Sequence, residues 1–406
     1  MVRVNRVRVL LLVWTCLVVA RCGTKEAELI EENVDPICRE RVIHDQYIVK
    51  YSDDRGLQRE DLTRDQLKQT LTKSHVEWVE PNYEIPAVVG DSLAASAVIH
   101  PNAARIGATY GWNRGYRGQG VRVAVVDSGV DWRQPLLASA LRDPLGESTM
   151  APRPNGIDED NNGYPDDLYG WNFVGNTPQV RDESGHGTHI AGIIASSHEP
   201  GSQLAGIAPG VTLIVADFME NDHGDEYNAI RAIEYVLKRG ARIVNNSWSN
   251  FCSYSIRNAF QSWQNLDVVF VNAAGNNGRW IDSLPIFPSN LNFMNMVTVG
   301  SVNRYGQRSS FSNYGANVLI YAPGEEVFSL GTYDMAPNAL IARSGTSMST
   351  AYVSGALALA WSAFPRKSAR QLVSALHKSA EGDLHAQPVA IVNIPALLRA
   401  LAQSTN

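Results

Sequence analysis

Hydrophobic residues along most of the chain form two alternating kinds of run, which predict strands and helices in turn. Short runs rich in β-branched and apolar residues are typical of strands buried on both faces of a parallel sheet. Six runs have this character: 121–126, 211–216, 242–246, 268–272, 296–299 and 317–321. Their spacing leaves room for a helix between most neighbours.

The intervening segments predict helices. In 227–239, the residues Ile230, Ile233, Val236 and Leu237 share one helical face. The segment 346–363 is nearly all small and apolar, which predicts a helix running through the core. Alternating strands and helices predict an α/β fold, with a doubly wound, mostly parallel sheet flanked by helices over residues 96–406.

The first quarter of the chain has a different pattern. An acidic, featureless linker covers 23–41, and then 46–54 predicts a strand, 64–71 a helix and 76–85 a second strand. This order predicts a small α+β unit within residues 23–95, ahead of the larger domain.

The N-terminus predicts export. Arg3, Arg6 and Arg8 precede the apolar run 9–20, as in a secretory signal peptide spanning 1–22. Two alternatives stay open, an uncleaved membrane anchor and a lipid anchor on Cys22. No apolar run reaches the length that a transmembrane helix needs, so we expect no such helix after signal removal.

Composition narrows the functional classes. The 406 residues are 44% hydrophobic and carry a formal net charge of −6, so nothing favours nucleic acid as a partner. Of four cysteines only Cys252 lies in 96–406, which excludes a disulfide framework there. A secreted domain of this kind needs another brace, and calcium is the natural candidate.

Three glycine-rich stretches carry candidate chemistry: 123–131, 185–192 and 344–349. They supply Asp127, His186 and Ser347. A serine hydroxyl becomes a nucleophile when an imidazole takes its proton and a carboxylate orients that imidazole. Asp127 ends a predicted strand, whereas His186 and Ser347 open helices. Ligands of open α/β sheets bind beyond the carboxyl ends of strands, so we expect the three to converge there.

In these stretches and in their order, Asp before His before Ser, the chain resembles the subtilisin-like serine peptidases, the subtilase family. The segment 271–278 matches a fourth element of that family. The resemblance implies a secreted serine endopeptidase in which Asn276 and the Ser347 N–H stabilise the oxyanion. It also implies a self-processed zymogen, with 23–95 holding an inhibitor-like propeptide and a cut within 87–97. The sequence does not reveal the oligomeric state, so a monomer is the default expectation.

The resemblance also implies where substrate binds. The residues expected to line the path of an extended peptide substrate are Ser247, Trp248 and Ser249. The small residues Ala273, Ala274 and Gly275 would leave the first specificity pocket open. Trp248 is interpreted as a flat wall that favours apolar or aromatic residues upstream of the cut, or alternatively as ordinary core packing.

A calcium site is predicted in the acidic segment 158–167. Asp158, Asp160 and Asn162 fall at loop positions one, three and five, with Gly163 at six and Asp166 at nine. The closing Glu of an EF-hand is missing, because Tyr169 stands there. The alternative is a solvated acidic turn.

Other functions stay open at this stage. The same site could ligate peptides, or the chain could be a catalytically silent peptide-binding pseudoprotease. It could also be a surface-anchored lipoprotein with vestigial activity. His189, three residues after His186, is interpreted as a packed helix residue and not as a zinc ligand, because Gly187 stands where zinc peptidases place a Glu.

Overall fold

The computed structural model describes residues 28–29, 41–86, 92–94, 101–141, 155–199, 202, 204–251, 253–284, 286–381 and 389–404. The predicted signal segment, Cys22, Cys252 and most of the predicted cleavage stretch 87–97 lie outside these residues. None of the helices in the described ranges is both long and apolar enough to cross a membrane.

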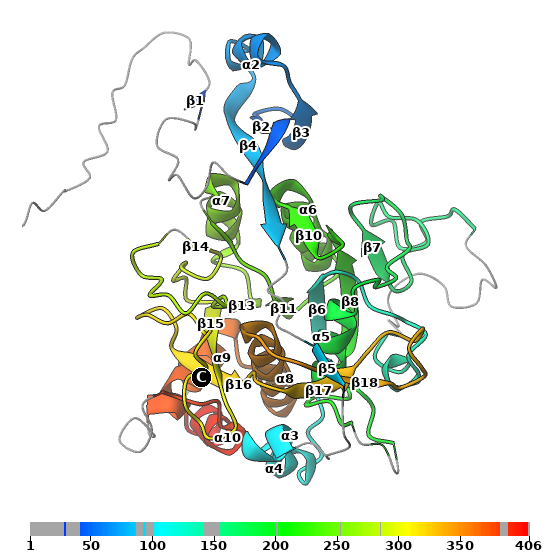
Figure 1. Ribbon diagram of the computed structural model, residues 1–406, viewed down its shortest axis with the longest axis vertical. Helices are drawn as coiled ribbons and strands as arrows, with labels where there is room; N and C mark the ends of the chain where they lie inside the picture. Colours follow the sequence, from blue (N-terminus) through cyan, green and yellow to red (C-terminus); the bar gives the residue numbers. More distant parts are fainter. Residues whose placement is uncertain are drawn as a thin grey trace, which may run out of the picture.

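A seven-stranded sheet, parallel throughout, forms the centre of the larger domain (Figure 1). Its strand order is β16-β15-β13-β11-β6-β8-β7. The strands span, in that order, Ile320–Pro323, Met296–Val302, Val269–Ala273, Ile243–Asn246, Arg122–Asp127, Thr212–Asp217 and Gly170–Asn172. The predicted α/β fold with a parallel sheet is therefore confirmed, and each of the six predicted strands is present with its ends moved by a few residues.

Helices cover both faces of this sheet. On one face lie α5 (His186–Ala195), α8 (Thr346–Ala363), α9 (Ala369–Glu381) and α10 (Ile394–Gln403). On the other lie α6 (Glu226–Lys238) and α7 (Tyr254–Trp263), which share a second core cluster with the sheet. Two short helices, α3 (Pro101–Arg105) and α4 (Ala108–Trp112), and a 3-10 turn at Pro135–Leu137 complete the domain.

The central helix α8 runs through the core, as predicted. Every residue from Thr346 to Trp361 is buried, and the helix contacts β11, β13, β15 and β16. Small residues let it pack closely against its surroundings: a Cβ on Gly355 would lie 2.7 Å from Ile207 Cβ, in the loop before β8. Close packing on all sides fixes the position of the first turn, which carries Ser347.

The N-terminal unit has two strands more than predicted, β3 and the two-residue β1. It contains β2 (Val42–Tyr51), β3 (Leu57–Asp61), α2 (Arg64–Leu71) and β4 (Val76–Pro86). The extra strand β3 pairs antiparallel with β2, and β2 pairs with β4. A two-residue strand, β1 (Glu28–Leu29), pairs with β4 on the other side. The polar β3 lies at the sheet edge and buries no complete face, so its sequence lacks the alternation of a half-buried strand.

The N-terminal sheet continues into the larger domain (Figure 1). The end of β4 pairs antiparallel with β10 (His223–Asp225), which pairs in turn with β9 (Met219–Glu220). Two smaller sheets are also present. One joins β12 (Asn250–Phe251) to β14 (Ile286–Phe287), and the other has the order β17-β18-β5, spanning Val327–Leu330, Leu340–Arg343 and Ser92–Ala94.

We predict that Leu357→Ala lowers the free energy of unfolding by about 2–5 kcal/mol, because it leaves a cavity in the packing around α8. Leu357 is fully buried, whereas Leu319 is 45% exposed and provides the matched control. Denaturant unfolding in a Ser347→Ala background avoids self-digestion. Equal small losses of unfolding free energy for Leu357→Ala and Leu319→Ala would contradict the close packing of α8 in the core.

Candidate active site

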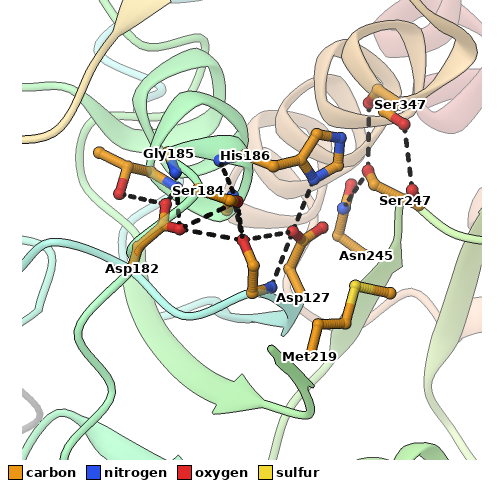
Figure 2. Close-up of polar contacts among 12 residues, drawn as sticks. Asp127, Asp182, Ser184, Gly185, His186, Met219, Asn245, Ser247 and Ser347 are labelled. Carbon is orange, nitrogen blue, oxygen red and sulfur yellow. Dashed lines mark hydrogen bonds and ion pairs between the residues drawn. The ribbon is translucent and has the colours of Figure 1, made fainter. Parts of the chain in front are cut away.

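Asp127 and His186 meet where β6 ends and α5 begins. Asp127 is the last residue of β6, and His186 is the first residue of α5. His186 Nδ1 lies 2.6 Å from Asp127 Oδ1, and both side chains are almost completely buried (Figure 2). This bond fixes the ring orientation and leaves Nε2 as the nitrogen available for proton transfer.

A glycine makes this approach possible. Gly187 follows His186 in the first turn of α5, and a Cβ at that position would lie 2.0 Å from the carbonyl oxygen of Gly129. Any larger residue would therefore push α5 away from the loop that follows Asp127. The glycine that replaces the Glu of a zinc peptidase thus has a steric role here.

A second buried carboxylate, Asp182, holds the loop before His186. It accepts hydrogen bonds from the N–H groups of Gly185 and Thr188, both at 2.8 Å, and from the Thr188 hydroxyl at 2.6 Å. Ser128 Oγ donates to Asp182 and also contacts Asp127 Oδ1 at 3.3 Å. Figure 2 shows this chain of contacts leading to Asp127. Asp182 is therefore a positioning residue that sequence reasoning missed.

One sequence signal could have indicated Asp182. The N-cap of α5 is Gly185, which has no side chain to accept the N–H groups of the first turn. An acidic residue three positions earlier can supply the missing acceptor. Burial raises the pKa of Asp182, and the charge of Asp127 acts in the same direction. The hydrogen bonds that Asp182 accepts from Thr188 and Gly185 oppose this shift.

The charge of Asp127 also tunes His186. Burial opposes the charged imidazolium, but the charge and hydrogen bond of Asp127 outweigh it, so the pKa of His186 is raised. His189 shows the contrast within the same helix. Burial, with nearby positive charge, lowers the pKa of His189 to about 3, and its Nε2 lies 3.0 Å from the Val327 carbonyl oxygen. His189 therefore stays neutral and structural.

Ser347 lies in the first turn of α8, next to Ser247. Its hydroxyl donates to the carbonyl oxygen of Ser247 at 3.0 Å, and the Ser247 hydroxyl donates to the Ser347 carbonyl at 3.1 Å. Asn245 donates to Ser247 Oγ at 2.8 Å. Figure 2 shows Ser347 and Asp127 on different sides of the His186 ring. Within the described part of the chain, His186 Nε2 is buried and has no hydrogen-bond partner.

Asn276 is held beside the same helix start. Its Oδ1 accepts from the Thr346 N–H at 2.9 Å and from the Thr346 hydroxyl at 3.0 Å, which turns its amide nitrogen away from Thr346. Gly275 has φ +98°, and a Cβ there would lie 2.5 Å from Asn313 Nδ2. Asn313 in turn donates to the Ala274 carbonyl at 2.8 Å. The loop thus needs glycine at 275 to place Asn276.

The predicted substrate-binding residues border this site. Ser247 is buried beside Ser347, and Ala273 and Ala274 are fully buried. Trp248 is fully buried as well, and it packs edge-on against Phe218 with ring centroids 5.4 Å apart. Its cluster includes Ile85 from β4, so part of the Trp248 environment comes from the N-terminal unit. Trp248 therefore lies in a core cluster to which the N-terminal unit also contributes.

Three of the four predicted calcium ligands, Asp158, Asp160 and Asn162, lie together, whereas Asp166 turns away from them. Asp158 accepts from the N–H groups of Asn162 and Gly163, and Asp160 accepts from Asn162. Asp166 accepts from the backbone of residues 155 and 156 instead. In the described residues, no group of three or more His, Cys, Asp or Glu is placed to hold a metal ion. The present side-chain positions therefore fit an acidic turn closed by its own hydrogen bonds.

The neighbouring Asp167 ties this loop to α6. It is fully buried, and Arg239 Nη1 and the Tyr235 hydroxyl contact its Oδ2 at 2.8 and 2.6 Å. Asn162 donates to the same oxygen at 2.9 Å. Burial raises the pKa of Asp160, and the charge of Asp167 adds to the shift. The negative charge of these carboxylates still favours the binding of a cation by the loop.

Comparison with known proteins places the chain among peptidases. A model of the subtilase family matches residues 118–394. A thermostable alkaline protease of Halalkalibacterium halodurans is 28% identical over 322 residues, which cover 79% of this chain and 76% of the relative. Thermitase of Thermoactinomyces vulgaris is 29% identical over 266 residues, covering 65% of this chain and 82% of the relative.

Solved structures agree. A cold adapted subtilisin-like serine proteinase superposes with a TM-score of 0.54 at 26% identity, over 68% of this chain and 90% of its own. Fervidolysin from Fervidobacterium pennivorans, a keratinolytic enzyme, superposes with a TM-score of 0.71 over 92% of this chain and 63% of its own. At 20% identity the second likeness shows the fold alone.

We predict that kcat/KM falls with acid at a pH above the ordinary histidine value of about 6.5. His186 accepts a proton only when neutral, and its raised pKa moves the loss of activity upward. Asp127→Asn should lower kcat by about 10⁴-fold and move the acid limb to lower pH. The exposed Glu199→Gln is the control. An unchanged limb in Asp127→Asn would show that Asp127 does not tune His186.

If calcium binds the loop, EDTA should lower the melting temperature, and calcium should restore it. Asp160→Asn removes one ligand and one excess charge, so this variant should lose the response to EDTA. The exposed Glu199→Gln, outside the loop, should keep it. Identical melting of the wild-type protein with and without EDTA would exclude a structural calcium ion.

Proposed function

The chain belongs to the subtilase family and is a subtilisin-like serine endopeptidase; from this we propose that Asp127, His186 and Ser347 form its catalytic triad. We further propose that the enzyme is secreted as a zymogen that cuts its own N-terminal segment. The buried Asp127–His186 pair at 2.6 Å carries the proposal. This pair fixes the tautomer of the His186 imidazole, beside Ser347 at the start of α8.

Catalysis begins with rotation of the Ser347 hydroxyl from the Ser247 carbonyl toward His186 Nε2. His186 takes the proton as Ser347 Oγ attacks the substrate carbonyl carbon, and Asp127 stabilises the imidazolium. The same proton then passes to the leaving amine. Water hydrolyses the acyl-enzyme by the reverse sequence, with His186 again the base, and this restores Ser347.

The oxyanion of the tetrahedral intermediate would accept hydrogen bonds from Asn276 Nδ2 and the Ser347 N–H. Thr346 donates two hydrogen bonds to the Asn276 side-chain oxygen. The amide nitrogen is therefore already turned away from Thr346 and does not have to rotate during the reaction. The N–H groups of a first helical turn favour an anion. Removing one such donor typically costs about 10²–10³ in kcat.

The N-terminal unit has the contacts of a docked propeptide. Its strand β4 adds to β10, with Ile85 opposite Gly224. Glu80, fully buried, accepts from the N–H groups of Tyr254 and Ser255 at the start of α7, both at 2.8 Å. A carboxylate at a helix N-terminus is favoured by the helix dipole. The unit thus uses main-chain, ionic and apolar contacts at one interface.

Removal of this unit would uncover an apolar surface. Ile85 is fully buried in the cluster that contains Phe218 and Trp248. Substrates that replace β4 would place their own side chains there. We therefore propose a preference for apolar residues upstream of the cut, as Trp248 suggests.

The proposals of secretion and lipid attachment come from the N-terminal sequence, and a monomer is the default expectation. The resemblance of 1–22 to a signal peptide supports export, and Cys22 leaves a lipid anchor as a variant of it. The pseudoprotease alternative is weaker, because such a protein has no need for a buried Asp–His pair with a raised histidine pKa.

We predict that Ser347→Ala abolishes both peptide hydrolysis and self-processing. The purified wild-type chain should lose its N-terminal segment up to a bond within 87–97, while Ser347→Ala keeps the segment. Ser349→Ala, two residues later in α8, is the matched control and should be processed. Intact mass and N-terminal sequencing of all three distinguish these forms.

Adding wild-type enzyme to Ser347→Ala tests whether the bond itself can be cut. Processing of Ser347→Ala without added enzyme, in a preparation free of other proteases, would contradict the assignment of the nucleophile.

A further inference from the structure

Two strands of the same chain segment, β4 and β5, each add to a strand of the larger domain. Upstream, β4 pairs antiparallel with β10 and ends with Pro86 opposite His223. Downstream, β5 pairs antiparallel with β18, with Ser92 opposite Arg343. Arg343 precedes Ser347 by four residues. Five residues lie between Pro86 and Ser92, and the six Cα–Cα steps span about 20 Å when extended.

The end of β18 is tied to both catalytic elements. Arg343 is mostly buried, and its guanidinium donates to the carbonyl oxygen of Ser184 at 2.6 Å. Ser184 precedes His186 by two residues, and its hydroxyl accepts the His186 N–H at 3.1 Å. A peptide paired with β18 is therefore placed relative to His186 as well as Ser347.

The outer edge of β18 is available for pairing. One edge of β18 pairs with β17, from Val327 opposite Arg343 to Leu330 opposite Leu340. In the described chain, β5 alone covers the other edge, and it is three residues long (Figure 1). An uncovered strand edge is a template for an added extended peptide.

We propose that the outer edge of β18 is a binding strand for the residues downstream of the cut, first those of the chain itself and then those of substrates. This inference rests on the proposed function. β4 and β5 both run antiparallel to their partner strands. One extended peptide can therefore pair with β10 through its upstream residues and with β18 through its downstream residues. After cleavage upstream of Ser92, β5 becomes part of a free chain end that frays readily and gives way to a longer substrate.

The test compares peptides cut by the processed enzyme. The reference peptide has the chain's own residues 82–91, the second extends downstream to 96, and the third, of equal length to the second, extends upstream to 77. We expect kcat/KM to rise about tenfold or more for the downstream extension relative to the reference, the effect of two or three main-chain hydrogen bonds. The upstream extension should give a smaller gain. Mass spectrometry of the products locates the bond that is cut.

N-methylation separates strand pairing from other effects of length. In an antiparallel pair, only alternate residues exchange N–H···O bonds with a given neighbour. Methylating the nitrogen of residue 92 or of residue 93 in the downstream peptide should therefore abolish the gain at one position and spare it at the other.

Equal kcat/KM for all three peptides, a gain shared by the upstream extension, or the same response at both methylated positions would overturn the β18 proposal while leaving the peptidase intact. If the enzyme hydrolyses other peptides but cuts none of these, self-processing as proposed fails too, and the inference fails with it.

Discussion

The ion pair between Asp127 and His186 joins the end of the central strand β6 to the first turn of α5, and the other parts of the site are arranged around it. A buried carboxylate is costly unless it is paired and hydrogen-bonded, so the surroundings must hold both partners closely. Gly187 allows the helix to approach, and Asp182 caps its first turn. Arg343 connects this loop to β18, and so to the segment that leads to Ser347.

The N-terminal unit depends on the same geometry. Its strand β4 adds to β10, which directly precedes α6, and its Glu80 caps the start of α7. Both contacts lie on the face of the sheet opposite α5 and α8. The unit therefore docks without disturbing the helices that carry His186 and Ser347. Its chain then leads from the pairing of β4 with β10 to the pairing of β5 with β18.

The sequence predicted what depends on local pattern. The bounds of α8 and α2 agree with the predicted helices, because a run of small and apolar residues and a Thr63 capping box mark their limits. The strand β3 was missed because an edge strand of polar residues buries no complete face. Asp182 was missed although the glycine N-cap at Gly185 signals the need for a nearby acceptor, and its link to Asp127 runs through Ser128, which is distant in sequence. In the acidic loop, residue spacing could not fix the direction of Asp158 and Asp166, which turn toward backbone N–H groups.

We propose that the buried pair of Asp127 and His186 activates Ser347, and active-site labelling measures this activation. The processed enzyme would be treated with a fluorophosphonate probe, and the labelled residue would be located by peptide mapping. We predict a single adduct on Ser347, with labelling that slows by orders of magnitude in Asp127→Asn. Folded, processed enzyme that takes up no probe, or an adduct on another serine, would contradict it.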